Sequence, residues 1–327
     1  MTTTMGELSL SPAISVILPV LNEEPHLAES VTAILSQDYV GIFEIILALG
    51  PSRDRTNKVA EELALRDGRI KLVANPSGKT AAGLNLAIAA SASPVIVRVD
   101  GHAKIPKNYL SLAIAILRES GAVNVGGVMA AEGITKFEIA ISRAMRSPLG
   151  VGASRFHTGG EAGEVDTVYL GAFRRDAINA VGGFDERYTR AQDWELNHRL
   201  RKNGGKIYFD PRLQVTYRPR PNLSKLAKQY FQYGRWRRVV SRSHPGTVNL
   251  RYLAPPLTLA GTLASLLFGL IIHPIIYLPA AVYGIFLLIS SALIAKSARE
   301  FISLLAIIPT MHFAWGAGFI TSTKVLR

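Results

Sequence analysis

The sequence has 327 residues, of which 48% are hydrophobic, no cysteine, and a formal net charge of +13. Without cysteine, neither a disulfide framework nor a thiolate metal site is possible. The charge is concentrated, because residues 199–251 hold fourteen Lys and Arg against one acid, Asp210. A basic segment of this kind suits nucleic acid or anionic lipid headgroups.

The first part of the chain alternates short β-rich runs with helical stretches. We predict strands over 14–20, 44–49, 70–74 and 95–99, and helices over 27–35, 56–66 and 81–90. Strands that alternate with helices form βαβ units, so the pattern predicts an α/β fold with a largely parallel central sheet. The polar segment 1–11 lacks the basic lead and apolar run of a signal peptide.

The strand over 95–99 leads into Asp100-Gly101-His102. Residues two apart in an extended chain point to the same side, so Asp100 and His102 can converge on one ion. In an open α/β sheet the carboxyl ends of the strands form the edge where ligands bind. The competing interpretation is an ordinary polar turn, which Asp-Gly alone favours.

Two apparent phosphate-binding motifs fail on inspection. Gly78-Lys79-Thr80 resembles the end of a P-loop, but Val73 occupies the position of the required first glycine. Gly150-Val151-Gly152 fails the dinucleotide fingerprint, because Arg155 stands in place of the last glycine. The sequence therefore supports neither a P-loop ATPase nor an NAD-dependent enzyme.

The middle of the chain is less regular. Residues 121–166 are rich in glycine and predict strands and mobile loops, followed by a strand over 167–175 and a helix from about 176. A further helix begins at Gln192-Asp193, which places Asp193 in a first turn where the helix dipole favours an ionised carboxylate. Such a carboxylate can serve as a general base, and the alternative is an acid that only caps the helix.

The last third of the sequence is typical of a membrane protein. Residues 223–242 predict a basic helix that carries four aromatic rings, an arrangement suited to a membrane interface. Residues 252–295 contain no Asp, Glu, Lys or Arg, which allows two spans separated by His273-Pro274. A third uncharged run covers 301–323.

Basic residues flank the predicted spans. They precede the first span and follow the second, at Lys296 and Arg299, so the positive-inside rule puts both flanks in the cytosol and His273 on the far side. A third span would then put Lys324 and Arg327 outside, against that rule. Either the charge bias is overridden or the last segment is re-entrant.

Four motifs in order make the chain resemble membrane-anchored, inverting glycosyltransferases of family 2 with a GT-A fold. They are Pro19-Val20-Leu21-Asn22-Glu23, Asp100-Gly101-His102, Gln192-Asp193 and Gln232-Tyr233-Gly234-Arg235-Trp236. The segments 78–85 and 182–185 are weaker matches. The resemblance covers roughly residues 12–252, and within the family the chain is similar to the glucosyltransferases of succinoglycan biosynthesis.

The resemblance implies a role for each motif. It makes Asp193 the general base, within a catalytic set completed by Gln232, Arg235 and Trp236. It gives the donor site as Pro19, Asn22, Glu23, Asp54, Lys79 and Asp100. It also implies a divalent cation, Mn²⁺ or Mg²⁺, on Asp100 and His102, and the imidazole slightly favours Mn²⁺. The chain departs from the family at Leu49-Gly50-Pro51-Ser52, where two acids are common and one often reads the nucleotide base.

The resulting expectation is transfer of a single sugar from a nucleotide sugar, most simply a UDP-sugar, to a polyprenyl-linked or glycan acceptor. The enzyme would be a multi-pass cell-membrane protein with a cytosolic catalytic domain, in contact with membrane lipids and not with nucleic acid. Its divisions would be a GT-A-like domain over 1–221, a basic interfacial segment over 222–251 and about three transmembrane helices over 252–327.

Three other functions have some support in the sequence. A catalytically silent glycosyltransferase-like subunit would explain the missing acids at Leu49 and Gly50. A nucleic-acid-binding protein would explain the basic surplus, and a processive polysaccharide synthase can also carry a QxxRW motif. The intact Asp193 and the few predicted spans argue against the first and the last of these.

Overall fold

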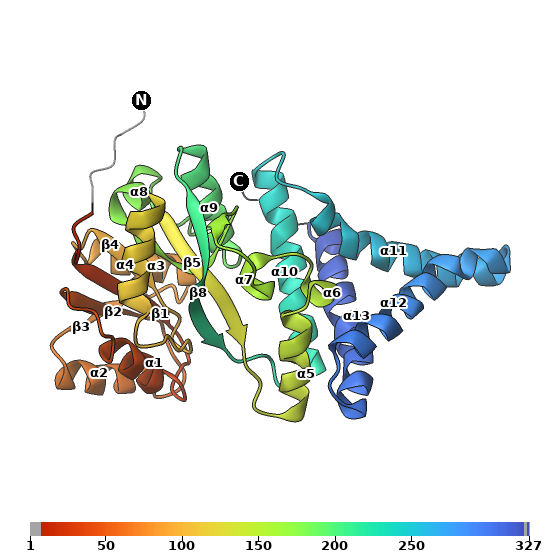
Figure 1. The fold of residues 1–327 in the computed structure, drawn as a ribbon, viewed down its shortest axis with the longest axis horizontal. Helices are drawn as coiled ribbons and strands as arrows, with labels where there is room; N and C mark the ends of the chain where they lie inside the picture. The colour runs from red at the N-terminus through yellow and green to blue at the C-terminus, as the bar shows by residue number, and fades with distance from the viewer. Residues whose placement is uncertain (1–7, 324–325, 327) are drawn as a thin grey trace. The chain divides into compact units, whose positions relative to one another are not determined.

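The computed structural model describes residues 8–323 and residue 326. The start of the chain, Lys324 and Arg327 lie outside the described residues. The chain groups into two compact units (Figure 1). The first unit contains the chain up to Ala130 and Gly159–Tyr217, and the second contains Ala131–Thr158 and Arg218 onwards.

The first unit is built on one eight-stranded sheet within the described residues. Its strands are β1 (Ile14–Val20), β2 (Phe43–Leu49), β3 (Ile70–Ala74), β4 (Val95–Arg98), β5 (Asn124–Ala131), β6 (Gly163–Glu164), β7 (Tyr169–Arg174) and β8 (Ile207–Tyr217). Their order is β3-β2-β1-β4-β7-β5-β8-β6. The first four strands in this order pair in parallel, whereas β7 pairs antiparallel with both of its neighbours.

Six helices belong to this unit: α1 (Leu27–Leu35), α2 (Thr56–Arg66), α3 (Thr80–Ala89), α4 (Tyr109–Ser120), α8 (Arg175–Ala180) and α9 (Gln192–Lys202). The parallel strands carry a continuous apolar core; Ile14, Val16 and Leu18 of β1 are fully buried. Because helices cover a parallel sheet on both faces, its strands read as unbroken apolar runs. The predicted α/β class and the predicted strands and helices up to residue 99 are confirmed, with ends that differ by one residue.

The glycine-rich segment after residue 121 was predicted incompletely. It contains the long buried strand β5 and the helix α5 (Lys136–Met145), and the partner strand β8 was not predicted. Glycine is required in β5, because a Cβ on Gly127 would lie 1.8 Å from the carbonyl oxygen of Leu213. The helix begins with a capping box formed by Thr135 and Glu138, a signal that the sequence does carry.

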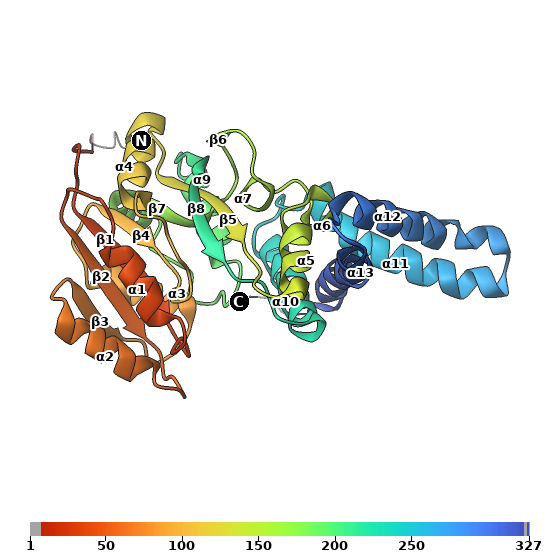
Figure 2. The same cartoon turned by 60° about the horizontal axis from the view of Figure 1, so that its bottom comes forward.

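The second unit is helical. Besides α5 it contains α6 (Pro148–Val151), α7 (Arg155–Thr158), α10 (Leu223–Ser243), α11 (Leu250–Ile271), the 3₁₀ helix η1 (Pro274–Tyr277), α12 (Leu278–Ile294) and α13 (Ala298–Thr321). Three helical segments, Leu250–Ile271, Pro274–Ile294 and Ala298–Thr321, are long and apolar enough to cross a membrane. Figure 2 shows α11 and α12 lying side by side as a hairpin.

Candidate active site

Polar side chains gather where β1, β2 and β4 end, because parallel neighbours bring their carboxyl ends to one edge of the sheet. The turn after β1 carries Asn22 and Glu23, and the loop after β2 contains Asp54. The turn after β4 carries Asp100 and His102. The first unit therefore brings the predicted nucleotide-binding loop and the predicted metal motif to the same edge, as the open-sheet rule requires.

The turn after β1 is hydrogen-bonded to the loop after β2. Asn22 adopts a left-handed conformation, with φ of 56°, and its side-chain oxygen accepts from the Arg53 N–H at 2.8 Å. The Glu23 N–H donates to Thr56 Oγ1 at 2.7 Å. Asp54 accepts from the backbone N–H groups of Thr56, at 3.1 Å, and of Glu24, at 3.3 Å. Asn22 and Asp54 thus hold the two loops together, in addition to any contact with a donor.

Arg98, the last residue of β4, joins two of the predicted acids. Its side chain is only 5% exposed, and its Nη2 lies 2.9 Å from Asp100 Oδ1. Its Nη1 donates to Oδ1 of Asp193, which lies on α9. One buried guanidinium therefore bridges the acid of the metal motif and the predicted general base.

The two bridged carboxyl groups differ in the direction of their pKa shifts. Burial raises the pKa of Asp193 above its ordinary value; the Arg98 charge opposes that effect and the Asp100 charge adds to it. Burial also acts to raise the pKa of Asp100, but the charges of Arg98 and His102 and the Arg98 hydrogen bonds outweigh it and hold that pKa below its ordinary value. Neighbouring carboxyl groups with pKa values shifted in opposite directions are typical of sites with separate chemical roles.

A buried amide network fixes α9, and with it Asp193. Asn197 of α9 is fully buried; it accepts from Asn124 Nδ2 at 2.7 Å and donates to Thr167 Oγ1 at 3.0 Å. Two residues before Asn197, Glu195 is held by Arg199 at 2.7 Å. Because these groups are buried and hydrogen-bonded, α9 has one favoured position against β5 and the residues before β7.

Asp193 does not cap its helix. The residue before α9 is Ala191, whose side chain cannot accept a hydrogen bond and whose φ is 61°. The Asp193 carboxylate, which is 23% exposed, is directed at Arg98 instead. The structure therefore gives α9 no side-chain cap and pairs the Asp193 carboxylate with a buried cation, which is a strong charge-assisted contact.

His102 has a carboxylate neighbour. Its Nδ1 lies 2.7 Å from Glu23 Oε1, and a Cβ on Gly101 would lie 3.1 Å from Glu23 Cγ, so the turn packs closely on that side chain. Among residues 8–323 and 326, no group of three or more His, Asp or Glu is arranged to hold a metal ion. Asp100 and His102 nevertheless offer a carboxylate and an imidazole, ligand types that suit Mn²⁺ when phosphate oxygens and water complete the shell.

The remaining predicted donor residues lie in or beside the same loops. Pro19 is in β1, and Lys79 precedes α3 directly after Gly78. Gly78 has φ of 61°, and a Cβ there would lie 3.2 Å from Pro51 Cδ, so this turn lies against the loop after β2. Asn85 of α3 donates to the Phe184 carbonyl at 2.8 Å, which links α3 to the segment 182–185.

The QxxRW residues belong to the second unit, on α10. Gln232 and Arg235 are half-buried, whereas Trp236 is 4% exposed. The glycine between them, Gly234, packs directly on the backbone of α13, since a Cβ would lie 1.9 Å from the Trp315 carbonyl oxygen. This segment therefore holds α10 against α13.

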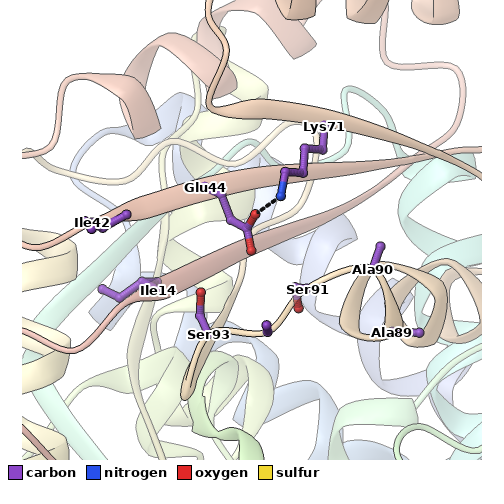
Figure 3. A pocket seen from close by; sticks show the side chains of 9 residues that line it. Ile14, Ile42, Glu44, Lys71, Ala89, Ala90, Ser91 and Ser93 are labelled. Atoms are coloured by element: carbon purple, nitrogen blue, oxygen red, sulfur yellow. Dashed lines mark ion pairs between the residues drawn. The ribbon is translucent and has the colours of Figure 1, made fainter.

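A cavity of about 440 Å³ lies at the opposite edge of the sheet, where the strands begin (Figure 3). Glu44 and Lys71 line it as an ion pair, with 2.7 Å between Oε2 and Nζ. Ser15 also donates to Glu44, at 2.7 Å. Glu44, the only acid that lines the cavity, is therefore paired with a cation. The cavity is separate from the polar loops at the carboxyl edge.

Arg98 is the main site residue that sequence reasoning missed. The sequence did contain a signal, because Arg98 is the only charged residue in the apolar run 95–99. A buried arginine needs acidic partners, and two predicted acids turn out to supply them.

Comparison with known proteins identifies the family. Residues 15–182 match the model of "Glycosyl transferase family 2". The chain is 30% identical to the succinoglycan biosynthesis protein ExoA of Rhizobium meliloti over 312 residues, which cover 93% of each chain. It is 27% identical to a dolichyl N-acetyl-alpha-D-glucosaminyl phosphate 3-beta-D-2,3-diacetamido-2,3-dideoxy-beta-D-glucuronosyltransferase of Methanococcus voltae, over 79% of this chain and 83% of the relative.

Solved structures show the same fold. The mannosyltransferase PcManGT of Pyrobaculum calidifontis, in complex with GDP-Man and Mn²⁺, aligns with a TM-score of 0.60 at 19% identity, over 94% of this chain and 86% of that one. Residues 1–349 of S. aureus TarS, in complex with UDP-GlcNAc, align with a TM-score of 0.52 at 17% identity, over 92% and 90% of the two chains. From the family match, the relatives and the GT-A-like fold together, the chain belongs to glycosyltransferase family 2 and is a glycosyltransferase.

Proposed function

We propose that the chain transfers one sugar from a nucleotide-sugar donor to a lipid-linked or glycan acceptor, with inversion at the anomeric carbon. The observation that carries this proposal is the bridge from Arg98 to Asp100 and Asp193, which brings the donor end of the site and a candidate base together. The Methanococcus voltae relative is named for a dolichyl phosphate-linked substrate, which supports a lipid-linked acceptor for this chain.

In the proposed reaction Asp193 accepts the proton of an acceptor hydroxyl. The hydroxyl oxygen forms the bond to the anomeric carbon while the bond from that carbon to the diphosphate breaks on the opposite face. The nucleoside diphosphate leaves with the electron pair of the broken bond, so a single displacement inverts the anomeric centre. The Arg98 charge favours the ionised form of Asp193, whereas burial favours the protonated acid and raises the Asp193 pKa overall.

Asp100 and His102 are the residues that would hold a divalent cation, and PcManGT was crystallised with Mn²⁺. Such a cation neutralises the charge that develops on a departing diphosphate. Glu23 would orient His102 through the contact at Nδ1, in the way that carboxylates support metal-bound histidines. Lys79 and Arg235 are the proposed additional cations for the diphosphate, and Gln232 completes the catalytic set. Because Trp236 is buried, we assign it the role of holding α10 in place.

The base and sugar of the donor would be found with a panel of nucleotide sugars. Membranes that contain the full chain are incubated with each donor, and the release of nucleoside diphosphate is measured with and without a lipid extract as acceptor source. The proposal expects release with one donor or a few, and loss of release in the Asp193→Asn variant. Absence of release with every donor and acceptor would instead support a catalytically silent subunit.

A further inference from the structure

Among the apolar helices, α13 is buried to an unusual extent. In the most apolar 18-residue stretch of α13, 39% of the residues are buried. The corresponding share is 17% for Leu250–Ile271 and 11% for Pro274–Ile294. The buried positions are Leu304, Ile307, Ile308, Met311, Gly316, Gly318 and Phe319, and the first four recur at spacings of three and four. A seam that runs the length of a helix shows packing against protein on that side.

The carboxyl half of α13 packs against the basic helix α10. A Cβ on Gly318 would lie 2.0 Å from the carbonyl oxygen of Phe231, so the two backbones touch. The Arg238 guanidinium lies 5.1 Å from the centre of the Phe319 ring. At the end of the helix, Ser322 donates to a carbonyl of α10, that of Arg235, at 3.1 Å.

The amino half of α13 also contacts polar groups. Arg143 of α5 forms an ion pair with Glu300, with 3.3 Å between Nε and Oε2. In the middle of α13, His312 lies against α6, and its Nδ1 is 3.2 Å from the hydroxyl of Tyr283 on α12. Figures 1 and 2 show α5, α10 and α13 side by side, so charged or polar partners accompany α13 from one end to the other.

Those partners cannot enter a hydrocarbon layer. α10 carries six cations and no acid: Lys225, Lys228, Arg235, Arg237, Arg238 and Arg242. Arg and Lys are strongly disfavoured at the centre of a membrane-crossing helix, and they favour the anionic headgroup region. Because residues 315–322, at the end of α13, pack backbone to backbone on α10, this half of α13 lies at the depth of α10. An α13 that crossed the bilayer would carry α10 with it.

We propose that α13 lies along the membrane surface beneath α5 and α10, and that only the hairpin of α11 and α12 crosses the bilayer. The hairpin has the properties of a lipid-embedded element, since its tip exposes apolar side chains such as Leu270 (81% exposed) and Ile272 (67%). Its first helix has 22 residues, about 33 Å at 1.5 Å per residue, enough for a hydrocarbon core of about 30 Å. Arg251 and Lys296 flank its base.

This arrangement keeps the end of α13 on the side where it begins. A chain that crosses twice and then lies in the surface has residues 296 and 323 in the same compartment. The basic end of the sequence then no longer conflicts with the positive-inside rule, because the last segment is not translocated.

Single cysteines test this directly, because the native chain contains no cysteine. Full-length Lys296→Cys, Thr323→Cys and His273→Cys variants are labelled with an impermeant maleimide in intact cells and again after permeabilisation. The proposal expects Lys296→Cys and Thr323→Cys to be labelled under the same condition. His273→Cys should show the opposite labelling pattern. Labelling of Thr323→Cys together with His273→Cys, and not with Lys296→Cys, would overturn it.

The depth of each helix in the bilayer gives an independent test, which does not depend on which side of the membrane a residue faces. Spin labels are placed on the exposed face of α13 at Ile302, Ala306 and Ile320, and at Leu263 near the middle of α11 as the control. The full chain is reconstituted in vesicles that contain phosphatidylglycerol, and collisions with oxygen and with a water-soluble nickel complex are measured. The proposal expects one shallow depth for the three α13 labels and a deeper one for Leu263. An Ala306 label deeper than both Ile302 and Ile320 would show a crossing helix and refute the proposal.

Discussion

Replacing Arg98 with methionine should move the acid limb of the pH–rate profile upward. Arg98 is the buried cation shared by Asp100 and Asp193, and its charge acts to lower the pKa of both. An opposite charge at such distances lowers a carboxyl pKa by about 1–3 units. Without it, Asp193 keeps the burial and the like charge of Asp100 that raise its pKa.

The sign and size of the effect follow from the role of Asp193 as a base. A base acts when ionised, so a pKa raised by about 1–3 units lowers the rate about 10- to 1000-fold at a pH below both the wild-type and the shifted limb. The rate should recover at a pH above that limb. The assay is nucleoside diphosphate release, with kcat/KM measured across pH for the wild type and the variant.

Two further variants make this result interpretable. Removing one partner of a buried ion pair costs about 3–5 kcal/mol of stability, so Arg98→Lys, which keeps the charge, covers the case in which Arg98→Met fails to fold. Arg69→Met is the matched control, since Arg69 pairs with Asp67 at 2.8 Å but is 42% exposed, and exposed pairs contribute only about 0–1 kcal/mol. An Arg98→Met enzyme with a wild-type limb, or with a loss that is equal at every pH, would refute the reasoning.

Three other predictions concern the base, the cation and the second unit. Asp193→Asn should lower turnover by about 10²- to 10⁴-fold, and a variant with more than about a tenth of wild-type turnover would contradict the base assignment. Asp100→Ala should abolish nucleoside diphosphate release, and His102→Ala should lose activity that excess Mn²⁺ partly restores, whereas wild-type activity in a chelator would rule the cation out. Gly234→Ala should destabilise the detergent-solubilised chain by about 1–3 kcal/mol in thermal unfolding, because the added methyl group overlaps α13. Gly261 is a helical glycine with open space around it, so Gly261→Ala should be neutral or stabilising in the same experiment.

The parts of the fold that local pattern determines were predictable from the sequence. The apolar runs of β1 and β2 specify buried parallel strands, and the long uncharged stretch with its His273-Pro274 break specifies the α11–α12 hairpin. The strand β5 was not predictable, because Gly126 is explained by the close approach of Val168 and Gly127 by that of β8, contacts distant in sequence.

The candidate site, like the fold, was predictable from the sequence only in part. Asp100 and Asp193 could be selected by motif, but their common contact with Arg98 depends on the register of β4 and on the docking of α9. The docking of α9 depends in turn on the buried pair Asn124 and Asn197, which are 73 residues apart. No local pattern reports such a contact, so sequence reasoning found the acids and missed the residue that joins them.

The hydrogen bonds between the turn after β1 and the loop after β2 have a consequence for how the donor binds. Fixing the backbone of one loop residue costs about 1–2 kcal/mol of conformational entropy. Because hydrogen bonds among Asn22, Glu23, Asp54 and Thr56 and their neighbours fix these two loops against each other, the donor does not have to order them. Loss of the Asp54 or Thr56 side chain would therefore increase the entropy lost on association, so it should raise the donor KM and leave kcat nearly unchanged.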